Sequence, residues 1–419
     1  MPWFKLKTMP HQLSLDLFQT AGVGVVALLL GFFFTKSIPF LKRYCIPAPV
    51  SGGLLVSLLV LACHGWFQTD ISFDGTIKDI CMMLFFTSVG YQSNLFSLKQ
   101  GGRPLVVMLI LVAILIAVQN LLSLGIAKGM GLDPLVGMAA GSIPMTGGHG
   151  TSGGFAPVLE DLGLQGAASI TMACATFGLV AGSLIGGPIA ERIIRRHHLA
   201  PESHSTDVVA GMESNTAAPD NKEKHARSEE KTFRDYAKAV YILVLTMALG
   251  VGLSKLLVRT GITFPTYFGS LIVACIIRNV CEGACKGRDV LGMDKIISLG
   301  NICLSLFLGI AMATLKLWEL ASLVLPLCVI LLAQVVFIAL YARWVAFPVL
   351  GKDYDAAVLV SGLCGFGLGA TPNAMANMSA VCFKYHYATV PFIIVPIIGA
   401  MFADLINTGI LTVFLNLLP

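Results

Sequence analysis

Long apolar runs separated by short polar stretches extend along almost the whole chain. A helix that crosses a bilayer needs about 20 mostly apolar residues. The pattern therefore predicts an all-α polytopic membrane protein with about ten transmembrane helices. The expected spans are residues 18–37, 48–66, 78–96, 104–127, 164–190, 237–257, 265–281, 296–315, 320–347 and 385–415.

Composition supports the membrane assignment. Hydrophobic residues make up 56% of the 419 positions and charged residues 12%, whereas soluble domains average roughly a quarter charged residues. Residues 1–17 form a polar tail without a short apolar core and cleavage site, so we expect no cleavable signal. The net charge of +5 does not require a nucleic-acid partner, because the basic residues fall mostly at the ends of apolar segments.

One long polar stretch, residues 192–236, divides the chain. It is rich in Arg, His, Ser, Asn, Lys and Glu and has almost no aromatic residues. A segment of this kind buries too little apolar surface to fold alone, so we expect a solvated cytoplasmic linker. Residues 18–191 and 237–419 then form two halves with five spans each.

The basic residues predict the orientation of the chain. If the linker is cytoplasmic, most other Lys and Arg residues, including Lys42, Arg103 and Arg343, also face the cytoplasm. Few remain outside, Lys128 and Arg259 among them. This asymmetry follows the positive-inside rule. Both termini are therefore expected outside.

The two halves carry similar motifs in the same order. Because each half has an odd number of spans, duplicated halves would have opposite topologies, which is the inverted-repeat architecture of many secondary transporters. The offsets lie between 216 and 222 residues: 49–56 matches 265–273, 84–86 matches 306–308, Asp133 matches Asp355, and 147–151 matches 367–371.

Each half also contains a cluster of glycines and small polar residues, GSIPMTGGHGT at 141–151 and CGFGLGATPN at 364–373. Such sequences are poor helix formers. Inside a bilayer, irregular backbone is tolerated where it lines a protein-enclosed, wet cavity. We therefore expect two re-entrant hairpins, near 133–157 and 353–380. The first would enter from outside and the second from the cytoplasm, and together they would form a transporter's binding site.

The hairpin tips offer ligands for both an anion and a cation. Helix N-termini attract a substrate carboxylate, and carbonyl and hydroxyl oxygens suit Na⁺. Small residues could alternatively serve only helix packing. The candidate substrate ligands are Thr146, Gly147, Gly148, His149, Gly150, Thr151, Gly367, Gly369, Thr371 and Asn373. The candidate Na⁺ ligands are Ser142, Gly365, Asn377, Asp404 and Asn407.

Two of the candidates are titratable. His149 could contact the substrate, relay a proton or simply be a packed, hydrogen-bonded histidine. Asp404 lies in the last apolar run, where a carboxylate is costly and typically functional, although it could also extend to a nearby interface. Asn94 and Asn301 are weaker candidates that could only link helices. Neither hairpin contains Arg or Lys, so helix N-termini, Asn and Thr, or a basic residue from elsewhere, must bind acidic groups.

Several motifs match a known family: IPAPVSGGLL at 46–55, GGHGT at 147–151, ACATFGL at 173–179, LSLFL at 304–308, LKLWEL at 315–320 and CGFGLGATP at 364–372. Through them the chain resembles the bacterial sodium/glutamate symporter family along nearly its whole length. The resemblance implies a homodimer in the inner membrane with scaffold and transport regions. It also implies elevator-like alternating access and Na⁺-driven uptake of L-glutamate without an organic cofactor.

Other functions remain open at this stage. The chain could transport another small carboxylate or couple transport to protons through His149 or Asp404, and a channel is a further alternative. An intramembrane enzyme is disfavoured because the sequence has neither a His-Glu-x-x-His motif nor a Gly-x-Ser-x-Gly motif. The absence of a Walker A sequence argues against an ATP-driven pump.

Overall fold

The computed structural model describes residues 11–94, 97–199, 222–259, 264–284 and 291–418. These residues are mostly helical, and seven of their helices are long and apolar enough to cross a membrane. The chain is therefore a polytopic helical membrane protein. The helices that contain these spans are α1 (Leu17–Ser37), α3 (Ala48–Phe67), α5 (Ser97–Gly129), α9 (Ala167–His197), α10 (Lys222–Val258), α12 (Met293–Ala313) and α13 (Val324–Tyr341). Helix α13 continues through the π-helical segment η3 (Ala342–Ala346) into α14 (Phe347–Leu350).

Shorter helices occupy the other three expected spans. Helix α4 (Thr76–Gln92) corresponds to the expected span 78–96, and α11 (Phe268–Ala284) to the expected span 265–281. Each has 17 residues, or about 26 Å of helix. The expected span 385–415 is wrong at its beginning, because residues 385–388 are not helical. Its helical part comprises α17 (Thr389–Ile397), the π-helical segment η4 (Ile398–Phe402) and α18 (Ala403–Leu417).

The polar regions differ from expectation in two places. The expected tail contains a strand, β1 (His11–Leu15), which pairs in parallel with β2 (Thr69–Phe73). The expected linker is helical at both ends, over residues 192–197 at the end of α9 and over 222–236 at the beginning of α10, because these stretches are rich in good helix formers such as Arg, Lys, Glu and Ala. Residues 1–10 of the tail and 200–221 of the linker lie outside the described residues.

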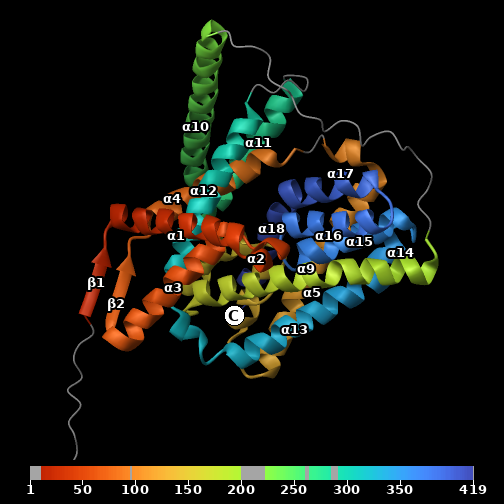
Figure 1. Cartoon of the computed structure of the whole chain (residues 1–419), viewed down its shortest axis with the longest axis horizontal. Helices are drawn as coiled ribbons and strands as arrows, with labels where there is room; N and C mark the ends of the chain where they lie inside the picture. The colour runs from red at the N-terminus through yellow and green to blue at the C-terminus, as the bar shows by residue number, and fades with distance from the viewer. Residues whose placement is uncertain (1–10, 95–96, 200–221, 260–263, 285–290, 419) are drawn as a thin grey trace, which may run out of the picture.

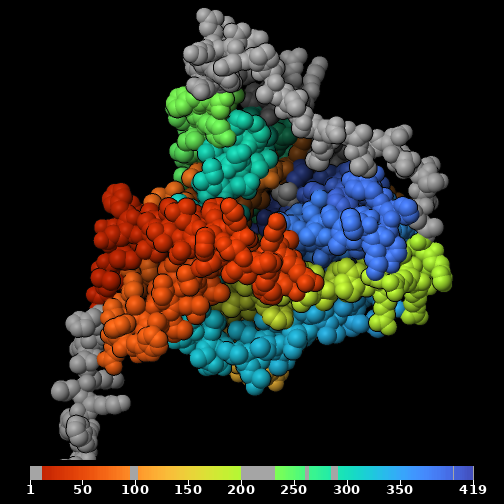
Figure 2. All heavy atoms as spheres, in the orientation of Figure 1, coloured from red at the N-terminus to blue at the C-terminus, as the bar shows by residue number. Residues whose placement is uncertain are grey.

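The helices form two groups (Figure 1). In the first, here called the six-helix group, α3 packs against α1 and α12, while α11 packs against α10 and α4. The second, here called the hairpin group, contains α5, α9, α13, α17, α18 and the short helices between them. On the face shown in Figure 2, the first helices of the chain (red and orange) and its last part (blue) occupy neighbouring areas, while β1, where the described residues begin, lies at the left edge.

Glycines let two helix pairs in the six-helix group approach closely. A Cβ added at Gly52 would lie 1.8 Å from the carbonyl oxygen of Ala27, across the contact between α3 and α1. A Cβ added at Gly269 would lie 2.2 Å from the carbonyl oxygen of Gly250, across the contact between α11 and α10. Small residues at crossings of this kind are typical of packed membrane helices.

Both glycine clusters lie where one short helix ends and the next begins. The first hairpin consists of α6 (Pro134–Ala139), α7 (Ser142–Met145) and α8 (Gly148–Asp161), and the second of α15 (Tyr354–Gly367) and α16 (Thr371–Lys384). Helices α8, α15 and α16 have 14 residues each, or about 21 Å, which is shorter than the roughly 30 Å hydrocarbon core of a bilayer.

Aspartates begin both hairpins, at the expected position in the first and two residues before the matched Asp355 in the second. The Asp133 side chain caps α6 by accepting from the Leu135 N–H at 2.8 Å. In the second hairpin the cap is Asp353, which accepts from the Ala356 N–H at 2.7 Å. Asp355 instead lies in the first turn of α15. A carboxylate near a helix N-terminus is stabilised by the unpaired N–H groups there.

Candidate substrate and ion cavity

The interruptions of the two hairpins meet at one cavity of about 260 Å³. Its wall also includes Gly399 in η4 and apolar side chains of the six-helix group, such as Phe85 and Leu304. The cavity thus lies where the two helix groups meet. The structure places eight candidate residues in the wall: Thr146, Gly147, Gly148, His149, Gly150, Gly369, Thr371 and Asp404.

Two helix N-termini open into this cavity. Helix α8 begins at Gly148 and α16 begins at Thr371, and both residues line the wall. Neither helix has a side-chain hydrogen bond at its N-cap, and first-turn N–H groups have no partner within a helix. These ends therefore carry partial positive charge. No Arg or Lys is among the lining residues, so the positive potential of the wall comes from the backbone.

The two hairpin tips touch at Gly148. This residue has φ of +60°, a left-handed conformation that glycine adopts without strain. A Cβ added there would lie 2.9 Å from the carbonyl oxygen of Gly369 in the second hairpin. A second close approach joins the second hairpin to η4, because a Cβ added at Gly399 would lie 2.2 Å from Thr371 Oγ1. Glycine is therefore required for both contacts.

Gln119 of α5 connects the hairpins through its side chain. Its Nε2 donates to the carbonyl oxygen of Gly367 at 2.7 Å, and its Oε1 accepts from Thr146 Oγ1 at 2.6 Å. The backbone carbonyl of Gln119 accepts in turn from Gln334 Nε2 at 2.8 Å. A single buried amide thus holds the irregular backbone of both hairpins in position.

A satisfied hydrogen-bond network lies behind the first hairpin. Ser142 Oγ donates to Asn407 Oδ1 at 2.7 Å and accepts from Asn120 Nδ2 at 2.9 Å. The Ser142 N–H donates to Asn120 Oδ1 at 2.9 Å, and Asn407 Nδ2 donates to the Ser142 carbonyl at 3.2 Å. Neither Ser142 nor Asn407, both proposed Na⁺ ligands, is in the cavity wall. Their positions indicate that they anchor the hairpin.

Four other candidates also lie outside the cavity wall. The amides of Asn373 and Asn377 donate to the α9 carbonyls of Leu179 and Gly182 at 2.8 and 2.9 Å. They attach α16 to α9. Gly365 packs against the backbone of Asn373 and Ala374, and Gly367 accepts from Gln119, as described above. Asn94 and Asn301, the weaker candidates, are not in the wall either.

His149 and Thr151 make specific contacts near the cavity. His149 Nε2 lies 3.0 Å from Thr176 Oγ1. Because the Thr176 hydroxyl donates to the Met172 carbonyl at 2.9 Å, His149 is the donor, and its Nε2 carries a proton. Thr151 does not line the wall, but its hydroxyl donates to Asp404 Oδ1 at 3.3 Å. Asp404 is the second residue after η4, and π-helical segments often occur at functional sites.

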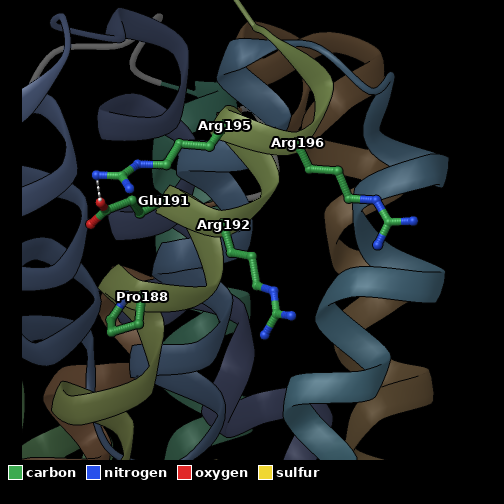
Figure 3. A pocket seen from close by; sticks show the side chains of 5 residues that line it. All are labelled: Pro188, Glu191, Arg192, Arg195 and Arg196. Carbon is green, nitrogen blue, oxygen red and sulfur yellow. Dashed lines mark ion pairs between the residues drawn. The ribbon is translucent and has the colours of Figure 1, made fainter.

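A second pocket, of about 460 Å³, lies at the C-terminal end of α9 (Figure 3). Its lining is Pro188, Glu191, Arg192, Arg195 and Arg196, with no residue of the hairpin tips. Glu191 forms ion pairs of 2.6 Å with Arg195 and with Lys384 of α16. The Arg192 and Arg196 side chains point away from Glu191 (Figure 3). This pocket marks the basic end of α9.

Comparison with known proteins identifies the family. A model described as "Sodium/glutamate symporter" matches residues 13–387. The chain belongs to this family. A protein of Escherichia coli (strain K12) named "Sodium/glutamate symporter" is 39% identical over 96% of this chain and 98% of its own length. A protein of Haemophilus influenzae with the same name is 38% identical over 94% of this chain and 96% of its own length. The resemblance inferred from the motifs is confirmed, and the family is one of transporters rather than enzymes.

Sequence analysis missed several residues of the site. Gln119, Asn120 and Gln334 are buried polar side chains in the apolar helices α5 and α13. Polar residues inside an otherwise apolar run were the available signal, since they usually mark a function or a helix contact.

Proposed function

We propose that this chain is a secondary active transporter that couples uptake of L-glutamate to the entry of Na⁺. Relatives named "Sodium/glutamate symporter" match this chain over nearly their whole length. The observation that carries the proposal is the convergence of two uncapped helix N-termini on one cavity. Na⁺ is the co-transported ion, and the mechanism needs no organic cofactor.

The two helix ends suit the two carboxylates of L-glutamate. One carboxylate accepts from the first-turn N–H groups of α8, at Gly148, His149 and Gly150. The other accepts from the Thr371 N–H and hydroxyl at the beginning of α16. Helix N-termini bind anions through such N–H groups and through the helix dipole. This arrangement explains how a wall without Arg or Lys among its lining residues recognises an acidic amino acid.

The cavity also offers ligands for a cation. Asp404 is the only acidic residue among those that line the wall, and hydroxyl and carbonyl oxygens surround the hairpin tips. Bound Na⁺ would order these groups and raise the affinity for glutamate. Thermodynamic linkage requires that glutamate raise the affinity for Na⁺ by the same factor.

The proposed architecture is ten spans in two inverted five-helix repeats, each with a re-entrant hairpin. Equivalent contacts in the six-helix group support it. A Cβ added at Gly53 of α3 would lie 3.1 Å from the carbonyl oxygen of Gly309 in α12. In the equivalent pair, a Cβ added at Gly90 of α4 would lie 2.3 Å from the carbonyl oxygen of Leu271 in α11. Transport would move the hairpin group relative to the six-helix group in an elevator-like step.

We also propose a homodimer in the bacterial inner membrane, with both termini outside. The orientation is tested with single cysteines at Lys42 and Lys128 in a cysteine-free protein. A membrane-impermeant thiol reagent should label position 128 in intact cells and position 42 only after permeabilisation. The reverse pattern would invert the topology. Mass measurement of the detergent-solubilised protein tests the dimer, and a monomer mass would exclude it.

The deciding experiment for function is uptake of radiolabelled L-glutamate into proteoliposomes, with and without an inward Na⁺ gradient. We expect accumulation that requires Na⁺ and collapses when a sodium ionophore is added. Accumulation driven by a proton gradient alone would contradict Na⁺ coupling. Absence of glutamate uptake under either gradient would refute the substrate, and competition by other small carboxylates would then identify it.

A further inference from the structure

Two buried hydroxyl groups near the cavity, Tyr267 Oη and Thr408 Oγ1, form no hydrogen bond of normal geometry with the described residues. Both side chains are 0% exposed. The two hydroxyls lie beside each other and close to the Asp404 carboxylate. Buried polar groups almost always have a partner, so unpaired ones require an explanation.

Packing fixes the direction in which the Tyr267 hydroxyl points. The Tyr267 ring stacks on Phe86 of α4, with ring centroids 3.6 Å apart and an angle of 9° between the planes. Phe155 of α8 meets the same ring edge-on, at 6.2 Å and 82°. Gly154 leaves room for the ring, because a Cβ added there would lie 2.4 Å from it. The ring therefore cannot turn to give its hydroxyl another partner.

The neighbouring oxygens come from two further helices. Thr408 lies one turn after Asp404 in α18, and residues at this spacing share one face of a helix. From α8, the Thr151 hydroxyl donates to Asp404 Oδ1 at 3.3 Å. One carboxylate and three hydroxyl oxygens thus gather at the edge of the cavity, and Asp404 also lines the cavity itself.

We propose that Tyr267, Thr408, Thr151 and Asp404 form the binding site for the co-transported Na⁺. The proposal rests on the function proposed above and specifies its ion site. Oxygen ligands suit a hard cation, and the single carboxylate balances the charge of one Na⁺. The two unpaired hydroxyls would direct their lone pairs to the ion. Ser142, Asn407, Asn377 and Gly365 are not needed as ligands, because they are engaged in the contacts described above.

The site joins the two helix groups. Tyr267 directly precedes α11 of the six-helix group, whereas Thr151, Asp404 and Thr408 belong to the hairpin group. Na⁺ bound to all four residues would favour the arrangement in which Tyr267 faces Asp404. Displacement of the hairpin group relative to α11 would remove one ligand and weaken Na⁺ binding. The ion would therefore distinguish between two positions of the hairpin group.

The test is the Na⁺ concentration that gives half-maximal L-glutamate uptake in proteoliposomes, measured for Tyr267→Phe and Thr408→Val. Loss of one oxygen ligand should raise this concentration about tenfold, with the glutamate affinity at saturating Na⁺ unchanged. Thr408→Ser keeps the hydroxyl and should behave as wild type. Tyr91→Phe is the matched control, because this buried tyrosine already has a partner, Thr246 Oγ1 at 2.6 Å.

Direct binding separates an ion ligand from a residue that only supports folding. In calorimetric titration of the purified protein with NaCl, Asp404→Asn and Tyr267→Phe should weaken the binding of Na⁺. An unchanged Na⁺ dependence in Tyr267→Phe and Thr408→Val would overturn the site while wild-type symport stands. If Asp404→Asn instead weakens glutamate binding and leaves Na⁺ binding normal, Asp404 binds the substrate's ammonium group. That result would also overturn the proposed Na⁺ site. If wild-type uptake does not require Na⁺, the proposed function itself fails.

Discussion

The first and second hairpins reach the same cavity but are anchored differently. In the first hairpin, Ser142 forms reciprocal hydrogen bonds with Asn120 of α5 and Asn407 of α18. In the second, the amides of Asn373 and Asn377 donate to carbonyls of α9. The first anchor thus uses both the side chain and the backbone of Ser142, whereas the second uses only backbone carbonyls as acceptors.

The largest expected effect concerns the point where the hairpins touch. Gly148→Ala should reduce glutamate uptake to about a tenth of wild type or less, because an overpacked contact costs roughly 1–3 kcal/mol. The contact at risk is that with the Gly369 carbonyl oxygen, 2.9 Å from the added Cβ.

The matched control is Gly131→Ala. Gly131 also has positive φ, +69°, but an added Cβ has nothing within 4 Å. In both variants the alanine must adopt a left-handed backbone conformation, which costs roughly 1–2 kcal/mol. Equal uptake in the two variants would show that the hairpin contact is unimportant.

Gln119 of α5 and Gln334 of α13 offer the next comparison, since both are fully buried amides in long apolar helices. Gln119→Leu should destabilise the protein by about 3 kcal/mol, because Thr146 Oγ1 loses its partner and the Gly367 carbonyl loses its best donor. Gln334→Leu should cost less than about 1 kcal/mol, since Gln334 Oε1 has no partner in the described part of the chain. Thermal unfolding in detergent measures both, and similar losses would contradict the role of Gln119.

The unequal anchors predict a smaller difference. Asn407→Leu should cost about 2 kcal/mol, because both the Ser142 hydroxyl and the Ser142 carbonyl lose a partner. Asn377→Leu should cost about 1 kcal/mol, since it removes one bond to the Gly182 carbonyl. The same unfolding measurement applies. A larger loss for Asn377→Leu would mean that the second hairpin is held more firmly than its contacts indicate.

The smallest expected effects are those of the hydroxyl groups near the cavity. Thr371→Ala and Thr151→Ala should each lower glutamate uptake about fivefold, the loss of one hydrogen bond, without preventing membrane insertion. Thr371→Ser and Thr151→Ser keep the hydroxyl and should retain most of the uptake. Wild-type uptake in both alanine variants, at equal protein in the membrane, would refute the assignment of these residues.

The sequence alone located the parts of the site that have a local signature. The glycine clusters at 141–151 and 364–373 interrupt apolar runs, so the cavity wall could be predicted from composition and spacing. Asp404 was found in the same way, as a charge in an apolar run. The hydrogen bonds of Ser142 and Asn407 could not be predicted, because each depends on a partner on a distant helix. A serine that binds an ion and one that anchors a hairpin have the same sequence context.

The strand β1 and the position of Tyr267 were missed for the same physical reason. The strand β1 is five residues long and is stabilised by pairing with β2, which follows α1 and α3 in the chain. Its own residues therefore give little signal. Tyr267 acquires its position from Phe86 and Phe155 on two other helices. Local propensity predicts where helices form, and long-range packing decides which side chains meet.

The parallel pairing of β1 with β2 has a consequence for biogenesis. His11 pairs with Thr69 and Leu15 with Phe73, and α1 and α3 lie between the two strands in the chain. Because β2 follows α3 in the chain, the sheet can form only after both helices have been synthesised. The Asp74 N–H then donates to Thr20 Oγ1 at 3.1 Å and ties the end of the sheet to α1. The sheet thus joins the beginning of α1 to the end of α3. If the amino terminus is outside, the paired strands oppose movement of these two helix ends towards the cytoplasm.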